Sequence, residues 1–231
     1  MTDALPTVLL DLDGTLTDSA ALITEHLAAA IAGAGGPVFT PAQLLPLVGP
    51  PFEYALPELG LTDEQVAATV TAYRSSYGAV AATNTPLYPG ITDLLDRLSG
   101  FRLALATAKP ERLAAEIVDG LGLTRHFALV GGSDPVAGRV GKGPVVGSVL
   151  ERLGLDPARD PVVMVGDRHH DVEGAAEHGV PTIGVSWGYA TSPEELADAA
   201  LVVADVDALA EALLSWRASG SVRFRKATML P

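Results

Sequence analysis

The sequence VLLDLDGTLTDS, residues 8–19, combines an apolar run with two closely spaced acidic residues. It begins with consecutive apolar residues, which predict a strand buried on both faces of a parallel sheet. Asp11 and Asp13 follow at once, and alternation along an extended chain places their side chains on the same side. Two carboxylates beside a core strand repel each other unless a cation or a proton lies between them. The stretch therefore predicts a site at a strand end, where Gly14 lets the chain turn away.

Short apolar runs alternate with longer amphipathic segments along most of the chain. We expect strands at residues 7–10, 102–106, 128–130, 162–165, 182–185 and 201–203. Helices are expected at residues 91–99, 111–121, 144–153, 171–178 and 206–216. This alternation predicts an α/β fold with a doubly wound parallel sheet.

The interval 19–83 breaks the alternation, because it shows helix signals and no convincing strand. A helix rich in alanine and leucine is expected at 20–31. Thr62, with Gln65 three residues later, forms a capping-box pattern for a second helix that ends near residue 82. Prolines at positions 41, 46, 50, 51 and 57 divide the middle into short pieces. We therefore expect an inserted α-helical cap at 19–83 with hinges at 18–20 and 83–89, a core at 1–18 and 84–220, and a C-terminal tail at 221–231.

The composition limits the partners of the chain. Its formal net charge is −13, and a surface this acidic repels nucleic acid and anionic membranes, so we expect neither as a partner. The absence of cysteine excludes disulfides and thiolate metal sites. No apolar run approaches the roughly 20 residues of a membrane span, and the first residues lack the pattern of a signal peptide. We expect a cytoplasmic protein.

Polar residues also follow other predicted strands, at the edge where parallel α/β sheets bind ligands. Thr107 in LALATAKP either caps the next helix or contributes to an anion site at the helix start. Lys142 in GRVGKGP, one of three lysines in the chain, is either a solvated charge or the partner of a phosphate or carboxylate. Asp167 and Asp171 in VVMVGDRHHD are four residues apart, which brings their side chains together if the turn is helical. Their hard oxygen ligands suit Mg²⁺.

In order and spacing, DLDGTLTDS, ATAKP, GRVGKGP and VGDRHHD resemble the four signature motifs of the haloacid dehalogenase-like (HAD) phosphohydrolase superfamily. The match covers roughly residues 8–214. VGPPF, LYPGI and IGVSWGY are also similar to the phosphoglycolate phosphatase-like group, in which a helical cap follows the first motif. The resemblance implies a Rossmann-like core and a Mg²⁺-dependent phosphatase that hydrolyses a small phosphorylated metabolite.

By this resemblance, Asp11 is the nucleophile that attacks phosphorus and forms an aspartyl-phosphate. Asp13 is the general acid for the leaving alcohol and then the general base for the attacking water. Mg²⁺ is held by Asp11, the backbone carbonyl of Asp13 and Asp167, with Asp171 in support.

The resemblance also implies a set of residues that bind the phosphoryl oxygens. Thr107 and Lys142 supply side-chain donors. Backbone N–H groups near Gly14 and Ala108 add further donors. Lys109, two residues after Thr107, either faces the cleft and touches the leaving group of the substrate or is solvated.

We expect the three residues after Asp167 to take no direct part in catalysis or metal binding. We expect Arg168 to be a surface or helix-start residue. His169 and His170 could be taken for metal ligands, but neighbours in one turn are expected to point in different directions. We therefore interpret them as exposed or supporting residues.

The cap should supply substrate specificity, and its only fixed cation is Arg74, with His26 as a conditional one. A carboxylate-bearing substrate such as phosphoglycolate needs a cationic partner, so we favour another small phosphomonoester, such as a nucleotide or a sugar phosphate. The alternatives are a sugar phosphomutase on the same scaffold and a non-catalytic regulatory binding protein. A phosphonate-cleaving enzyme is disfavoured, because residues 19–83 contain no lysine for a Schiff base.

Overall fold

The computed structural model describes residues 5–49, 51–219, 221 and 224. In this part of the chain a single sheet of parallel strands has the order β3-β2-β1-β4-β5-β6. The strands are β1 (Thr7–Leu10), β2 (Arg102–Pro110), β3 (Phe127–Ser133), β4 (Val162–Gly166), β5 (Thr182–Val185) and β6 (Leu201–Val203). The chain builds outward from β1 in one direction and from β4 in the other, so the order reverses between these two central strands. The predicted doubly wound α/β fold is confirmed.

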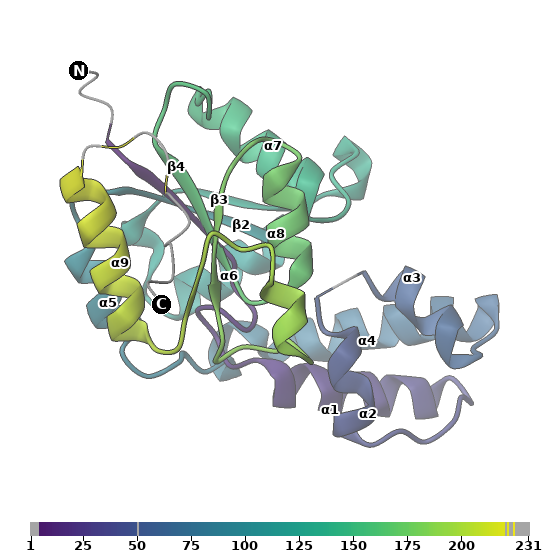
Figure 1. Ribbon diagram of the computed structural model, residues 1–231. Helices are drawn as coiled ribbons and strands as arrows, with labels where there is room; N and C mark the ends of the chain where they lie inside the picture. The colour runs from purple at the N-terminus through teal and green to yellow at the C-terminus, as the bar shows by residue number, and fades with distance from the viewer. Residues whose placement is uncertain (1–4, 50, 220, 222–223, 225–231) are drawn as a thin grey trace.

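Helices cover both faces of the sheet (Figure 1). One face packs against α5 (Ile91–Arg97), α6 (Glu111–Gly120) and α9 (Val206–Ser219), and the other against α7 (Lys142–Leu153) and α8 (His169–Ala176). The alternation within β1 explains this arrangement, since Val8 and Leu10 belong to the first cluster and Leu9 to the second. All three side chains are fully buried, as expected for a strand at the centre of a parallel sheet.

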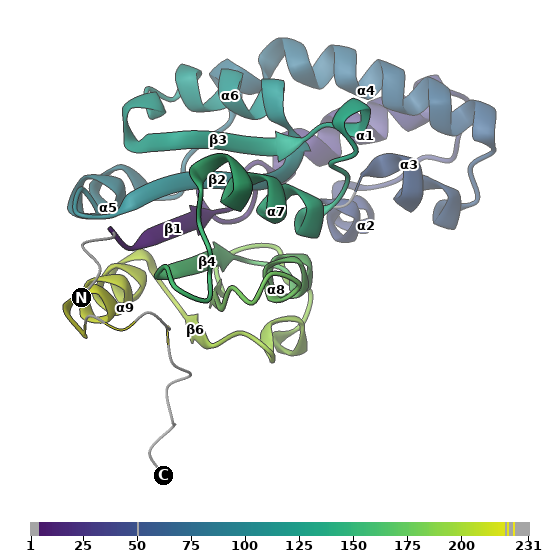
Figure 2. The same ribbon diagram turned by 90° about the horizontal axis from the view of Figure 1, so that it is seen from above.

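The segment between β1 and β2 is helical. It contains α1 (Ala20–Gly33), α2 (Pro41–Leu44), α3 (Phe52–Ala55) and α4 (Asp63–Asn84), with 3-10 turns at Leu45–Leu47 and Leu56–Leu59. The predicted capping box is present, because the Gln65 N–H donates to Thr62 Oγ1 and the Thr62 N–H donates to Gln65 Oε1. We call residues 19–83 the cap and the rest the core, and this division remains our proposal. Figures 1 and 2 show the cap beyond the end of the sheet toward which the strand arrows point.

Three elements near that end differ from the expected boundaries. Strand β2 continues to Pro110, with a shift in its register to β3 after Ala106, so Thr107 and Lys109 lie on the strand itself. Helices α7 and α8 begin two residues earlier than predicted. For α8 the cause is Asp171, whose Oδ2 accepts the N–H groups of Asp167 and Arg168 and caps the first turn.

Only residues 221 and 224 of the expected tail at 221–231 fall within the described residues. The ring of Phe224 lies against that of Trp216, with the centroids 5.9 Å apart. Among the helices described here, none is both long enough and apolar enough to cross a membrane.

Candidate active site

Segments far apart in the sequence meet at the carboxyl ends of β1, β2 and β4. They line a cavity of about 280 Å³, which we call the strand-end cavity. Its lining includes most of the residues singled out from the sequence: Asp11, Asp13, Thr107, Ala108, Lys109, Lys142 and Asp171. Asp167 lies beneath them and is fully buried. The structure therefore gathers the four motifs into one site.

Lys142 lies at the centre of this site. Its Nζ is 2.7 Å from Asp11 Oδ1 and 2.7 Å from Asp171 Oδ1, and it donates a hydrogen bond to the carbonyl oxygen of Ala106. Burial alone would lower the pKa of the Lys142 ammonium, but the two carboxylates raise it above its ordinary value. Lys142 is therefore a fixed buried cation, and the solvated interpretation is excluded.

Three buried carboxylates form a cluster, and two of them, Asp11 and Asp171, contact this ammonium. One oxygen from each of Asp11, Asp167 and Asp171 lies within 4.8 Å of the others. Burial raises the pKa of Asp11 to about 6, against the opposing effect of Lys142. Burial also raises the pKa of Asp167, with the charges of Asp171 and Asp11 adding to the effect. One ammonium does not offset this much negative charge, and the all-oxygen donor set fits a hard divalent cation such as Mg²⁺.

Gly14 lets the loop after β1 approach Asp167. Its φ is +84°, and a Cβ at this position would overlap the Asp167 carboxylate. The same carboxylate accepts hydrogen bonds from Thr15 Oγ1 at 3.3 Å and from the backbone N–H of Tyr189 at 2.6 Å. The N–H of Gly14 already donates to the carbonyl oxygen of Thr17. The N–H of Gly14 itself is thus engaged within the loop, and Gly14 leaves room for the Asp167 carboxylate. The expectation that backbone N–H groups near Gly14 bind phosphate stays a prediction.

We expect Gly14→Ala to lower the free energy of unfolding by about 2–4 kcal/mol, because it combines a left-handed backbone with a steric overlap. Gly138→Ala is the matched control, since Gly138 has a φ of +74° with no atom near its missing Cβ. That change should cost about 1 kcal/mol. Urea unfolding of both variants measures the difference. Equal losses would show that the contact with Asp167 does not matter.

Asp13 is held from two sides. Ser19 Oγ donates to its Oδ1 at 2.6 Å, and Lys109 Nζ lies 2.9 Å from its Oδ2. Lys109 also donates to the hydroxyl of Tyr77, which comes from helix α4 of the cap. Burial opposes the charge of Lys109, but Asp13 and the tyrosines raise its pKa above the ordinary value. Lys109 therefore faces the cleft and connects Asp13 to the cap, and the solvated interpretation is excluded.

Thr107 completes the strand-end cavity from β2. Its side chain is buried, and its Oγ1 accepts a hydrogen bond from the N–H of Lys109 at 3.3 Å. The hydroxyl proton of Thr107 remains available for a ligand in the cavity, because the observed bond uses only an oxygen lone pair.

Arg168 is buried, so the expectation of a surface residue is wrong, whereas its position directly before α8 agrees with a helix start. Its Nε donates to Glu195 at 2.7 Å, and its guanidinium donates to the carbonyl oxygen of Val48 at 2.9 Å. Val48 belongs to the cap, so Arg168 joins the core to the cap. Sequence reasoning could not find these contacts, because Glu195 and Val48 lie in segments far from Arg168 in the sequence.

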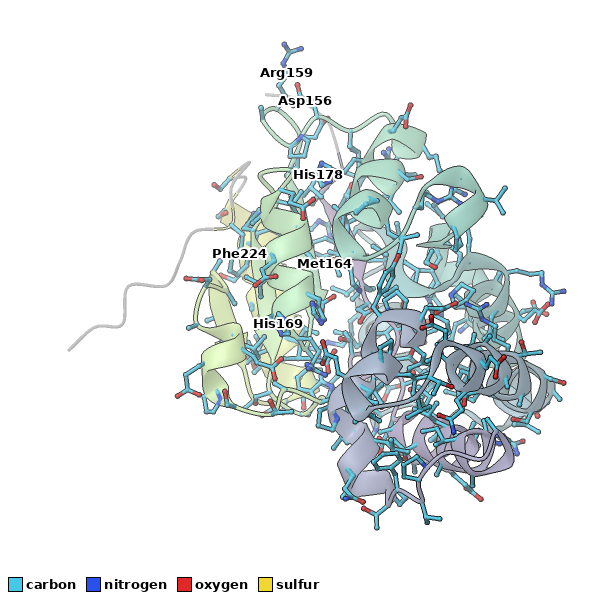
Figure 3. The ribbon with its side chains drawn as sticks, turned by 90° about the vertical axis from the view of Figure 1, so that its right-hand side faces the viewer. Asp156, Arg159, Met164, His169, His178 and Phe224 are labelled. Atoms are coloured by element: carbon cyan, nitrogen blue, oxygen red, sulfur yellow. The ribbon has the colours of Figure 1, made fainter. Side chains whose placement is uncertain are left out.

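The two histidines do not point in different directions, and that expectation is also wrong. His169 Nδ1 lies 2.9 Å from Glu195 Oε2, and this contact draws its ring beside that of His170, with centroids 3.8 Å apart. Burial lowers the pKa of His170, and His169 and Arg168 lower it further. Figure 3 shows His169 at the end of α8 that approaches the cap.

Two other residues of the site were missed. Ser19 was interpreted only as part of a hinge, yet its hydroxyl orients Asp13. Tyr189, the last residue of the quoted IGVSWGY, was given no role. Its N–H donates to Asp167, and its hydroxyl accepts from the N–H of Ala20 and donates to the carbonyl oxygen of Thr17. Tyr189 therefore joins the Asp167 carboxylate to the start of the cap.

Residues 8–185 match the family model of the haloacid dehalogenase-like hydrolases. The chain belongs to the haloacid dehalogenase-like hydrolase family. The resemblance seen in the four motifs is thereby confirmed. It extends to the phosphoglycolate phosphatase-like group, since the chain is 35% identical over 216 residues to a phosphoglycolate phosphatase of Agrobacterium fabrum, covering 90% of this chain and 92% of that protein.

Two further relatives of this haloacid dehalogenase-like chain have different descriptions. A tyrosine-protein kinase, PtkA of Mycobacterium tuberculosis, is 41% identical over 184 residues, which are 79% of this chain and 62% of the kinase. The chain thus spans less than two thirds of the length of that relative. A crystal structure of a predicted phosphatase from Clostridium acetobutylicum superposes with a TM-score of 0.84 and 32% identity, covering 92% of this chain and all of that one.

Proposed function

We propose that this protein is a Mg²⁺-dependent phosphatase that hydrolyses a small phosphomonoester through an aspartyl-phosphate on Asp11. The observation that carries the proposal is the placement of Asp11 at 2.7 Å from the Lys142 ammonium and within 4.8 Å of the Asp167 and Asp171 carboxylates. Asp13 lies on the same cavity wall, two residues away. A nucleophile, a fixed cation, a cation site and a second carboxylate therefore share one small cavity.

In the first step, an oxygen of Asp11 attacks phosphorus, and the bond from phosphorus to the leaving oxygen breaks. Asp13 donates a proton to that oxygen, which leaves as the alcohol. In the second step, Asp13 takes a proton from a water molecule, the water oxygen attacks phosphorus, and the Asp11 carboxylate leaves. Inorganic phosphate and the free enzyme result. Ser19 and Lys109 support both steps, because they hold the Asp13 carboxylate in place.

Lys142 and the Thr107 hydroxyl bind the equatorial phosphoryl oxygens, where charge changes during transfer. Ala108 lines the same wall of the cavity and extends the phosphate-binding strand. Asp11, Asp167 and Asp171 would hold Mg²⁺, with the backbone carbonyl of Asp13 as a further oxygen ligand. When bound, the ion supplies positive charge that offsets the repulsion between a carboxylate and a phosphate dianion.

Binding of Mg²⁺ is expected to stabilise the fold, and more so at neutral than at acidic pH. The pKa of Asp11 rises from 3.8 to about 6 on folding, and that of Asp167 rises as well. Between the unfolded and folded pKa of Asp11, the folded protein holds a proton that the unfolded chain has released. The stability of the metal-free protein therefore falls as the pH rises through this window. Mg²⁺ on the ionised carboxylates reverses this loss.

Thermal unfolding at about pH 4 and about pH 7, with and without Mg²⁺, measures this effect. At 100 times the Kd the stabilisation is about 2.7 kcal/mol, which for this chain length corresponds to roughly 5–10 °C in Tm. Asp167→Asn should lose most of the gain. A gain that is equal at both pH values would contradict the role of these buried carboxylates.

A panel of phosphomonoesters tests the proposed activity. We expect Mg²⁺-dependent release of phosphate that is lost in Asp11→Asn. A sugar phosphomutase would instead convert one sugar phosphate to its isomer without releasing phosphate. A non-catalytic regulatory protein would release none from any ester, and that result would contradict the proposal.

The kinase relative adds phosphoryl transfer to a tyrosine hydroxyl as a second candidate, supported by its 41% identity. An aspartyl-phosphate can be transferred to a hydroxyl as well as to water, so the two activities need the same first step. The panel therefore includes ATP labelled on its terminal phosphate, with a tyrosine-containing peptide present. Label on tyrosine supports the kinase, whereas unlabelled tyrosine together with release of phosphate from the monoesters supports the phosphatase.

A further inference from the structure

A second cavity lies between α4 of the cap and α6 of the core. It has a volume of about 590 Å³, and we call it the cap cavity. It shares part of its wall with the strand-end cavity, through the residues Asp13, Val48, Gly49, Pro51, Ala108 and Lys109. Asp13, the residue assigned to protonate the leaving oxygen, therefore stands where the two cavities join. A phosphoryl group beside Asp11 would place the rest of its ester in the cap cavity.

The lining of the cap cavity is mostly apolar. Apart from the shared wall, it includes Ile23, Phe52, Val70, Tyr73, Tyr77 and Leu113. The rings of Phe52 and Tyr73 meet edge to face, with their centroids 4.8 Å apart, and Tyr73 stacks on Tyr77 at 5.1 Å. Aromatic and aliphatic side chains of this kind favour a ring-bearing leaving group, because an apolar ring that packs against them is removed from water.

The cations that line the cap cavity, among the described residues, already have acidic partners. Arg74 lies 2.6 Å from Glu53, and Lys109 lies 2.9 Å from Asp13. The third cation is Arg112, which pairs with Glu116 at 3.3 Å. A carboxylate or second phosphate on the leaving group would have to compete with one of these acids and would be repelled by it. The charge arrangement therefore selects against an anionic leaving group.

We propose that the enzyme selects phosphomonoesters whose leaving alcohol is uncharged and carries an apolar ring. The inference rests on the proposed phosphatase function and specifies its substrate class. It separates this chain from an enzyme for phosphoglycolate, whose leaving group is small and anionic. The volume of the cap cavity also exceeds what such a small group would fill.

Three esters with leaving alcohols of similar acidity test the proposal: 2-phenylethyl phosphate, ethyl phosphate and 2-carboxyethyl phosphate. Their kcat/KM values are compared in Mg²⁺ by release of phosphate. We expect 2-phenylethyl phosphate to exceed ethyl phosphate by roughly 10–100-fold, since a buried ring adds binding in the transition state. The carboxyethyl ester should be the poorest of the three.

Three cap variants refine the test, one of them a control. Phe52→Ala should lower the ratio of phenylethyl to ethyl ester by about 10-fold, whereas Val38→Ala, at an exposed cap position outside both cavities, should leave it unchanged. Glu53→Gln releases Arg74 from its acidic partner, so the carboxyethyl ester should improve several-fold relative to ethyl phosphate.

The outcomes distinguish a wrong substrate class from a wrong phosphatase function. If all three esters are hydrolysed and the phenylethyl ester is no better than the ethyl ester, or the carboxyethyl ester is the best, the substrate class is wrong while the phosphatase function stands. If Mg²⁺-dependent hydrolysis is absent for every ester, and for the wider panel as well, the proposed function fails and the substrate class falls with it.

Discussion

Asp11→Asn is expected to lower kcat/KM by at least about 10⁴-fold, with the fold intact. An amide of nearly the same shape cannot attack phosphorus, so the first covalent step is lost. Folding should tolerate the change, because burial raises the pKa of Asp11 to about 6 and its ionised form at neutral pH is held at a cost. The Lys142 ammonium keeps its contact with Asp171 in the variant.

Asp156→Asn is the matched control for this substitution. Asp156 is exposed and lies at the end of the molecule opposite the cap (Figure 3). The Asp156→Asn variant should be as active as the wild type. Steady-state kinetics in Mg²⁺ and thermal unfolding are measured for both variants. If the Asp11→Asn protein retained activity within tenfold of the wild type, Asp11 could not be the nucleophile.

The second large effect is expected for Lys142→Met, which removes the fixed cation and keeps much of the side-chain volume. Phosphoryl oxygens lose a charged donor, so kcat/KM should fall by about 10²–10³-fold. The Asp11 and Asp171 carboxylates lose their shared partner at 2.7 Å, which should lower metal-free stability by about 3–5 kcal/mol. Mg²⁺ should restore part of the stability, because it neutralises the same carboxylates.

The distinguishing result is activity at saturating Mg²⁺, where the variant is folded. A purely structural lysine would give full activity under these conditions, whereas a phosphate-binding lysine would not. Arg152→Met is the control, since Arg152 is the basic residue in the last turn of the same helix and forms a partly exposed ion pair with Glu111. Arg152→Met should lower the free energy of unfolding by less than about 1 kcal/mol and should leave the activity unchanged.

The sequence was sufficient for the sheet and for the position of the site. Apolar runs at β1 and β4 predict central strands, and acidic residues directly after both runs predict a shared edge. Asp171 was placed beside Asp167 by its spacing alone, and the structure brings their oxygens within 4.8 Å. These inferences succeed because each depends on local periodicity and on one general rule of α/β topology.

Contacts between segments could not be predicted in this way. The bond from Lys109 to Tyr77 joins β2 to α4, and the bond from Arg168 to Val48 joins the start of α8 to the cap. Neither depends on a repeating pattern, since each is set by how the cap packs on the core. The two interpretations of Lys109 stayed open at the sequence level for that reason. Local sequence patterns therefore predict which residues meet at the strand ends, whereas the contacts between cap and core depend on tertiary packing.

Chemical trapping of the phosphorylated enzyme tests the central claim most directly. The protein is mixed with excess substrate and Mg²⁺, quenched in acid during turnover and treated with borohydride, which reduces an acyl phosphate to an alcohol and leaves free carboxylates unchanged. Peptide mass spectrometry then locates the reduced residue. We predict homoserine at the position of Asp11, dependent on substrate and absent in Asp11→Asn. An unmodified Asp11 in an enzyme that is releasing phosphate, or reduction at another carboxylate, would contradict the account.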